Sequence, residues 1–182
     1  MINRALFLDR DGIINIDYGY VHLKENFDFI DGIFELVKAA STLGMKIIVV
    51  TNQAGIGRGI YNEKQFHELS EWMCSQFEDQ GTPIDRVYFC PSHPIHGLGV
   101  YKKDDYLRKP SPGMLLKAKN EFSLDLNASV FIGDKPSDII AGNAANIGLN
   151  MLLSKNKTNE LTPYSYTLIH SLYEAIPLLQ TA

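Results

Sequence analysis

Residues 5–12 read ALFLDRDG, in which four apolar residues lead directly into Asp, Arg, Asp and Gly. An apolar run of this length is too short for a helix, and it does not alternate with polar residues. It therefore predicts a strand that is buried on both faces, as the strands of parallel sheets are. Runs of the same kind recur along the chain, at Lys46–Val50, Arg86–Phe89, Ser129–Ile132 and Leu149–Leu153.

Amphipathic stretches lie between these strands. Residues 33–43 have apolar side chains at helical spacing and are followed by Gly44, a residue typical of helix ends. Asn62 and Gln65 form a capping signature before a second apolar stripe, at Phe66–Phe77. Three further helices are expected to open at Ser111-Pro112, to begin with Ser137 as the cap, and to cover Leu172–Leu179. This alternation predicts a doubly wound, Rossmann-like α/β fold, with a parallel central sheet between two helical layers (three-layer α/β/α) and residues 1–182 as a single domain.

Two stretches interrupt the alternation. Gly12–Asp31 is too long for a simple strand-to-helix loop, and its segment Asp28-Phe29-Ile30 predicts a small hairpin. Pro91–Pro110 is expected to be an irregular loop between a strand and a helix. Loops of this length in a compact domain are typically functional or disordered.

The chain has 182 residues, of which 45% are hydrophobic and 21% charged, and its net charge is −4. This composition predicts a globular protein with a full core, and the acidic balance argues against nucleic acid as a partner. No apolar run is long enough to span a membrane, and the N-terminus lacks the apolar core of a signal peptide. Cys74 and Cys90 do not make a disulfide framework. We therefore expect a cytoplasmic protein without a membrane partner and with reduced thiols.

Ionisable and phosphate-suited residues follow the predicted strands, at the edge where open α/β sheets bind ligands. Asp9 and Asp11 follow the first strand, Thr51 the second and Asp134 the fourth. If strand geometry continues into the turn, the carboxylates of Asp9 and Asp11 point the same way and repel unless a cation lies between them. With Asp134 they make an oxygen-only site that suits Mg²⁺. Thr51 and Lys109 offer a hydroxyl, backbone amides and a positive charge to phosphate oxygens.

This set of residues predicts phosphoryl transfer. Asp9 is suited to attack phosphorus and form an aspartyl-phosphate, and Asp11 to protonate the leaving alcohol and then to activate water. A phosphorylated signalling receiver is a competing interpretation, but its acceptor aspartate ends a middle strand, where this chain has Thr51. A sugar-phosphate binder without catalysis is another, but it needs no nucleophile and acid together. The enzyme is the favoured interpretation.

Four motifs, in this order along the chain, resemble the signatures of the haloacid dehalogenase superfamily of phosphotransferases. They are Asp9-x-Asp11-Gly12, Thr51-Asn52, Lys109 and Gly133-Asp134-x-x-x-Asp138. The strings FLDRDGIIN, GYVH, NFDFIDG, VVTNQAGIGRG, RKPSPGML and GDKPSD are similar to those of one family within it, the heptose-1,7-bisphosphate 7-phosphatases, which are related to the histidinol-phosphate phosphatases. This closer resemblance extends to about Leu153.

The resemblance implies a superfamily member without a cap domain that acts as a cytoplasmic monomer on a small sugar phosphate. The implied reaction is the Mg²⁺-dependent removal of the 7-phosphate of D-glycero-D-manno-heptose 1,7-bisphosphate. Its product, a heptose 1-phosphate, would supply nucleotide-heptose synthesis for lipopolysaccharide or capsule. Histidinol phosphate or another small phosphomonoester is the alternative substrate, and the sequence does not indicate which anomer of the heptose is preferred.

Carried over by position, the resemblance makes Asp9 the nucleophile and Asp11 the general acid and base. It assigns Mg²⁺ to Asp9, to the backbone carbonyl of Asp11 and to Asp134, with Asp138 supporting the metal or capping its helix. Thr51 and Lys109 are implied to stabilise the phosphoryl group. The residues implied to bind the substrate are Asp17, Tyr18, Gly19, Tyr20, Thr51, Asn52, Gln53, Ala54, Arg108, Lys109 and Lys135.

The resembled family often holds a structural zinc ion in the long loop, and this sequence departs from that pattern. Cys90 is present, but Ser92 stands where the pattern has histidine, and Asp105 and Leu107 stand where it has two cysteines. Because leucine cannot bind zinc, a structural zinc is not expected. The alternative is a metal site of Cys90 with His93, His96 and Asp105 of the same loop. We expect packing to hold the loop instead, by the side chains of Val100, Tyr101, Tyr106 and Leu107.

Overall fold

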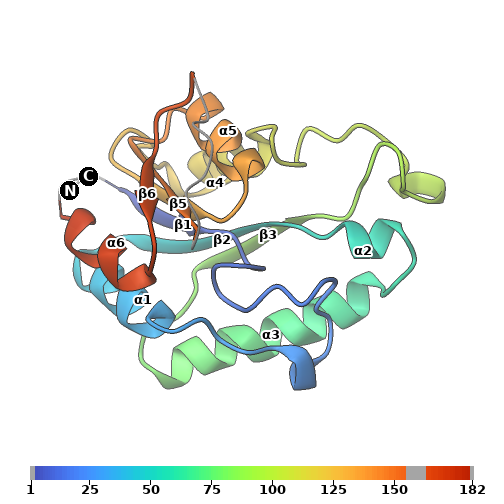
Figure 1. Ribbon diagram of the computed structural model, residues 1–182, viewed down its shortest axis with the longest axis horizontal. Helices are drawn as coiled ribbons and strands as arrows, with labels where there is room; N and C mark the ends of the chain where they lie inside the picture. Colours follow the sequence, from blue (N-terminus) through green and yellow to red (C-terminus); the bar gives the residue numbers. More distant parts are fainter. Residues whose placement is uncertain (1–2, 155–162, 181–182) are drawn as a thin grey trace.

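The computed structural model describes residues 3–154 and 163–180; the outermost ends of the predicted domain lie outside this part of the chain. Its centre is a six-stranded sheet in the order β3-β2-β1-β4-β5-β6, with every neighbouring pair parallel (Figure 1). The strands are β1 (Ala5–Leu8), β2 (Lys46–Asn52), β3 (Arg86–Cys90), β4 (Val130–Gly133), β5 (Leu149–Leu153) and β6 (Thr167–Ile169). The predicted parallel sheet is confirmed, and β6 is an edge strand of three residues that the apolar runs do not predict.

Helices cover both faces of the sheet, which confirms the three-layer arrangement (Figure 1). They are α1 (Ile33–Thr42), α2 (Ala54–Gly57), α3 (Glu63–Asp79), α4 (Gly113–Phe122), α5 (Pro136–Ala144) and α6 (Leu172–Leu178). Helices α1, α3 and α6 pack on the face with Leu6 and Leu8, and α4 and α5 on the face with Ala5 and Phe7. Successive side chains of a strand point to opposite faces, so a strand covered on both sides must be apolar throughout. Within the described residues, none of these helices has the length and apolar character needed to cross a membrane.

The order of the strands positions the functional site. Strand β1 has β2 on one side and β4 on the other, so the direction of strand order reverses at β1. In doubly wound sheets a ligand crevice forms outside the carboxyl ends of the strands at this point. Asp9 directly follows β1, Thr51 lies near the end of β2, and Asp134 directly follows β4. The fold therefore brings three of the predicted site residues to one edge.

The segment between β1 and α1 is not the predicted hairpin. Residues 12–31, all of which the structure describes, contain a short 3-10 turn at Lys24–Asn26 and no paired strands. Isolated bridges join Asn15 to Asp11 and to Phe29. Asn15 is fully buried, and its side-chain amide donates to the Asp11 carboxylate over 3.1 Å. Two backbone hydrogen bonds of 2.9 Å, from the Ile16 amide to the Asp28 carbonyl and from the Ile30 amide to the Ile14 carbonyl, flank the antiparallel Asn15–Phe29 bridge, so the hairpin pairing is limited to this single bridge.

The helix starts agree with the sequence in one case and differ in another. The Asn62 side chain accepts a hydrogen bond from the Gln65 amide (2.9 Å) and the Gln65 side chain accepts one from the Asn62 amide (3.0 Å), which confirms the predicted cap of α3. The prediction of Ser137 as the cap of α5 is wrong. Pro136 is the first residue of α5, and the Asp138 carboxylate accepts from the Lys135 amide over 3.0 Å. Proline suits a first helical position because it has no amide hydrogen to satisfy.

Replacing Asn62→Ala is expected to lower the free energy of unfolding by about 1 kcal/mol, because the first turn of α3 loses its side-chain acceptor. In a chain of this size the melting temperature falls by about 2–4 °C. The control is Glu71→Ala, an exposed position on the same helix. Equal melting temperatures for the two variants in a calorimetric comparison would show that the cap contributes nothing.

Candidate active site

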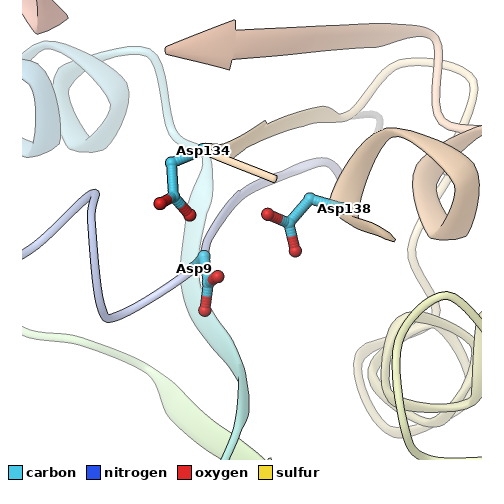
Figure 2. Close-up of side chains that lie close together, drawn as sticks. All are labelled: Asp9, Asp134 and Asp138. Atoms are coloured by element: carbon cyan, nitrogen blue, oxygen red, sulfur yellow. The ribbon is translucent and has the colours of Figure 1, made fainter. Parts of the chain in front are cut away.

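Three carboxylates from separate elements gather at the switch point. Asp9 follows β1, Asp134 follows β4 and Asp138 lies in the first turn of α5. One oxygen of each lies within 4.8 Å of the others, and Figure 2 shows the three side chains converging on one place. Asp9 and Asp138 are buried and Asp134 is partly buried. Like charges this close, with little water to screen them, repel strongly.

Lys109 supplies positive charge to this cluster. Its Nζ lies 2.9 Å from Asp9 Oδ1 and 2.6 Å from Asp138 Oδ1, and donates to the Val50 carbonyl over 2.9 Å. Burial by itself lowers the pKa of Lys109, but the charges of Asp138 and Asp9 raise it above its ordinary value. The ammonium therefore stays protonated and compensates part of the negative charge.

Lys135 Nζ lies 3.9 Å from Asp134 Oδ2 and compensates a further part of the negative charge, but not all of it. Burial, together with Asp138 and Asp134 and against the charge of Lys109, raises the pKa of Asp9 to about 7. Burial is also the main reason why the pKa of Asp134 rises to about 6. Within the described residues, Asp134 Oδ1 is buried without a hydrogen-bond donor. Oxygen ligands with excess negative charge and an unsatisfied acceptor fit a hard dication such as Mg²⁺.

Two glycines permit this close approach. Gly12 has a φ of +94°, and a Cβ at this position would lie 2.2 Å from Asp134 Oδ2. A Cβ on Gly133 would lie 2.2 Å from the Cβ of Asp138. Only a residue without a side chain fits either position, so these glycines belong to the architecture of the carboxylate cluster.

The side chain of Asp11 is separate from this cluster, contrary to the expected repulsive pair with Asp9. Arg10 Nη2 lies 2.8 and 2.9 Å from the two Asp11 oxygens, and Arg10 itself is almost fully buried. Strand β1 ends at Leu8, so strand geometry does not persist to Asp11. The backbone carbonyl of Arg10 accepts from the amides of residues 13–15, which turns the chain there. Whether the Asp11 carbonyl binds metal stays a prediction.

A polar network joins Asp11 to the end of β2. Gln53 Nε2 donates to Asp11 Oδ2 over 3.0 Å and to Thr51 Oγ1 over 2.8 Å. The Tyr61 hydroxyl donates to Gln53 Oε1. Asn52 and Lys109 exchange two hydrogen bonds between side-chain amide and backbone, over 2.9 and 3.0 Å. The end of β2 thus fixes both Asp11 and the segment that contains Lys109.

A cavity of 470 Å³ lies beside these residues. Its lining includes most of the predicted substrate residues, namely Asp17, Gly19, Tyr20, Asn52, Gln53, Ala54, Arg108, Lys109 and Lys135, together with Asp11. Thr51 is buried beneath it, and Tyr18 is exposed, with its hydroxyl donating to Asp28 over 2.8 Å. Gly55, Tyr61, Pro110 and Ser137 also line the cavity and were not predicted to bind substrate, although all of them except Tyr61 lie within the motif strings quoted above.

The long loop before α4 is not held as predicted. The side chains of Val100 and Tyr106 are 79% and 63% exposed, so the expected packing is wrong for these two residues. Tyr101 and Leu107 do pack against buried side chains. Ser92 and Asp105, which stand at two of the expected zinc-ligand positions, instead form a hydrogen bond of 2.8 Å with each other.

Comparisons with known proteins show the family to which the chain belongs. Residues 8–161 match the model of the polynucleotide kinase 3 phosphatase family. A D-glycero-alpha-D-manno-heptose-1,7-bisphosphate 7-phosphatase of Burkholderia mallei is 52% identical over 179 residues, which cover 98% of this chain and 95% of that protein. A D-glycero-beta-D-manno-heptose-1,7-bisphosphate 7-phosphatase of Vibrio cholerae is 45% identical over 157 residues, 86% of this chain and 84% of that protein.

Solved structures share the fold. A putative HAD-like phosphatase from Mesorhizobium loti superposes with a TM-score of 0.89 at 29% identity, over 99% of this chain and 87% of that chain. The D,D-heptose 1,7-bisphosphate phosphatase from B. bronchiseptica, solved with magnesium and phosphate, superposes with a TM-score of 0.81 at 22% identity, over 98% of this chain and 99% of that chain. The chain therefore belongs to the heptose-1,7-bisphosphate 7-phosphatase family of the haloacid dehalogenase superfamily.

Proposed function

We propose that this protein is a Mg²⁺-dependent phosphatase that removes the 7-phosphate of D-glycero-D-manno-heptose 1,7-bisphosphate. The observation that supports this most is the buried cluster of Asp9, Asp134, Asp138 and Lys109 beside a cavity with further cationic side chains. The relatives named for this reaction support the substrate. The proposal includes a monomer in the cytoplasm, without nucleic-acid or membrane partners; a net charge of −4 is unsuited to polyanionic nucleic acid.

In the first half of the reaction, an oxygen of Asp9 attacks phosphorus. An oxygen–phosphorus bond to Asp9 forms while the bond from phosphorus to the sugar oxygen breaks, and Asp11 donates a proton to that oxygen as it leaves. Lys109 and Thr51 offer a positive charge and a hydroxyl to the phosphoryl oxygens. Mg²⁺ held by Asp9 and Asp134 would neutralise charge on the transferred group.

In the second half, water hydrolyses the aspartyl-phosphate. Asp11, now ionised, accepts a proton from water, whose oxygen bonds to phosphorus as the bond to Asp9 breaks. Inorganic phosphate leaves and both aspartates return to their starting states. Gln53 and Arg10 fix the orientation of Asp11 through their hydrogen bonds, so the acid and base is held at the cavity wall.

We further propose that the α anomer of the bisphosphate is preferred. The relative named for the α anomer is 52% identical and covers 98% of this chain. Relatives named for the β anomer are 44–48% identical and cover 84–86% of it. A relative that matches 98% of the chain is the better guide to the substrate.

Asp9→Asn is expected to lower turnover by about 10³-fold or more, because an amide oxygen is a poor nucleophile. Asp11→Asn is the comparison. With a p-nitrophenyl ester, whose leaving group needs no proton, Asp11→Asn should still transfer the phosphoryl group to Asp9 but hydrolyse it slowly. Rapid-quench experiments with this ester, radioactively labelled in its phosphoryl group, are expected to detect a phosphoenzyme in Asp11→Asn and none in Asp9→Asn. Label in Asp9→Asn, or turnover above a few per cent, would remove Asp9 as the nucleophile.

Mg²⁺ is expected to stabilise the folded protein because it relieves the repulsion within the carboxylate cluster. At 100 times its dissociation constant, a bound ion adds about 2.7 kcal/mol, which corresponds to a rise of about 5–10 °C in melting temperature. Asp134→Asn should abolish this rise and increase the melting temperature without metal. The control Asp104→Asn changes an exposed carboxylate and should behave as the wild type. An undiminished Mg²⁺ shift in Asp134→Asn speaks against this metal site.

The α anomer should be hydrolysed with a kcat/KM about tenfold above that of the β anomer, the size of one altered polar contact. Steady-state kinetics on both anomers, with histidinol phosphate assayed in parallel, measures this. Equal values or a preference for β would refute the anomer assignment. A higher kcat/KM for histidinol phosphate than for either anomer would refute the proposed substrate.

A further inference from the structure

The loop between β3 and α4 presents Arg108 to the cavity, next to the buried Lys109. Arg108 is half-buried, and burial lowers the pKa of its guanidinium. Among the residues that the structure describes, no carboxylate forms an ion pair with Arg108. A desolvated cation without a carboxylate partner, in the wall of a cavity, is suited to bind an anion from a ligand.

Side-chain packing of Tyr101 and Leu107 accounts for only part of the position of this loop, since Val100 and Tyr106 are exposed. Hydrogen bonds to Asp105 order its last part. Asp105 Oδ2 accepts from the Ser92 hydroxyl over 2.8 Å, Asp105 Oδ1 accepts from the Leu107 amide over 3.0 Å, and the Asp105 carbonyl accepts from the Arg108 amide over 2.8 Å. Asp105 therefore fixes the backbone amides of both Leu107 and Arg108.

Ser92 is bonded to both Asp105 and Arg108. It is fully buried, two residues after the end of β3, and its backbone carbonyl accepts from Arg108 Nη1 over 3.2 Å. Ser92 thus contacts Asp105 through its hydroxyl and the Arg108 guanidinium through its carbonyl. We call this pair of residues the Ser92–Asp105 clamp. It ties both the backbone and the guanidinium of Arg108 to the end of β3.

The charges around the clamp favour this arrangement. Burial by itself raises the pKa of Asp105, but hydrogen bonds from the Leu107 amide and the Ser92 hydroxyl, with the nearby Lys103, hold it below its ordinary value. Asp105 is therefore ionised at neutral pH. Hydrogen bonds to an ionised acceptor are stronger than those to a neutral one.

We propose that Ser92 and Asp105 are positioning residues that hold Arg108 for recognition of the second anionic group of the substrate. This inference rests on the proposed function, in which the substrate has two phosphates. A guanidinium fixed before binding loses less conformational freedom when it meets a phosphate, so the clamp acts on affinity. It has little effect on the chemical step, because Lys109 is held independently by Asn52 and Val50.

The test compares Asp105→Ala and Ser92→Ala with Asp104→Ala, a matched control at the adjacent, exposed aspartate. The first two should raise KM for the heptose bisphosphate about tenfold with kcat within about twofold, and leave KM for p-nitrophenyl phosphate unchanged. Asp105→Asn keeps a hydrogen-bonding side chain and should recover most of the wild-type KM. Asp104→Ala should match the wild type on both substrates.

The same changes are then made in an Arg108→Ala background. If the clamp acts through Arg108, the double variant Asp105→Ala/Arg108→Ala should have the same KM as Arg108→Ala alone. An additive effect there, an unchanged KM in Asp105→Ala, or equal losses on both substrates would overturn the inference, because each result indicates a role that does not run through Arg108.

Amide hydrogen exchange makes the test independent of the substrate. The Leu107 amide should exchange faster in Asp105→Ala than in Asp104→Ala, because its acceptor is the Asp105 carboxylate. The Arg108 amide donates to the Asp105 backbone carbonyl, which alanine keeps, and serves as an internal reference. Equal exchange in the two variants would overturn the clamp whatever the enzyme hydrolyses. Failure of the proposed function is a different result, in which the wild type itself does not hydrolyse the heptose bisphosphate.

Discussion

The shared ammonium of Lys109 is the interaction on which the rest of the site depends. It lies between Asp9 and Asp138, while Asp134 completes the cluster with a buried oxygen that has no donor within the described residues. Lys109 and the half-exposed Lys135, 3.9 Å from Asp134, do not fully balance three crowded carboxylates, so the folded chain keeps an excess of negative charge there. Repulsion within the cluster lowers the stability of the folded chain when no metal is bound. It also makes the site complementary to a dication, which can stabilise the charge that develops during phosphoryl transfer.

The sheet and the long loop each bring part of this arrangement. Strands β1 and β4 are neighbours, so their carboxyl ends deliver Asp9 and Asp134 to one place without any long connection. The loop before α4 delivers two adjacent cations with separate supports. Lys109 is anchored to the end of β2, and Arg108 to the end of β3. Because the two residues are anchored separately, Lys109 can act in phosphoryl transfer while Arg108 binds the second anionic group of the substrate.

Residues that follow a strand could be predicted, because the apolar runs locate the strands and parallel strands end at a common edge. Asp9 and Asp134 belong to this group. The cap of α3 could also be predicted, because it depends on residues three apart, whereas Lys109 lies in the long loop before α4, where the strand pattern does not place it. The orientation of Asp11 could not be predicted, because it depends on a buried arginine and on Gln53, 42 positions away. The bond between Ser92 and Asp105 crosses 13 positions of irregular loop. Such contacts depend on tertiary structure that no local pattern contains.

The central claim is that the carboxylate cluster binds one hard dication beside a nucleophilic Asp9. Crystals soaked with Mn²⁺ and beryllofluoride, a mimic of a phosphoryl group on a carboxylate, test it directly by anomalous scattering. We predict one Mn²⁺ peak bound by Asp9 and Asp134, with beryllium bonded to an oxygen of Asp9. A cluster without Mn²⁺, or beryllofluoride on any residue other than Asp9, would contradict the account.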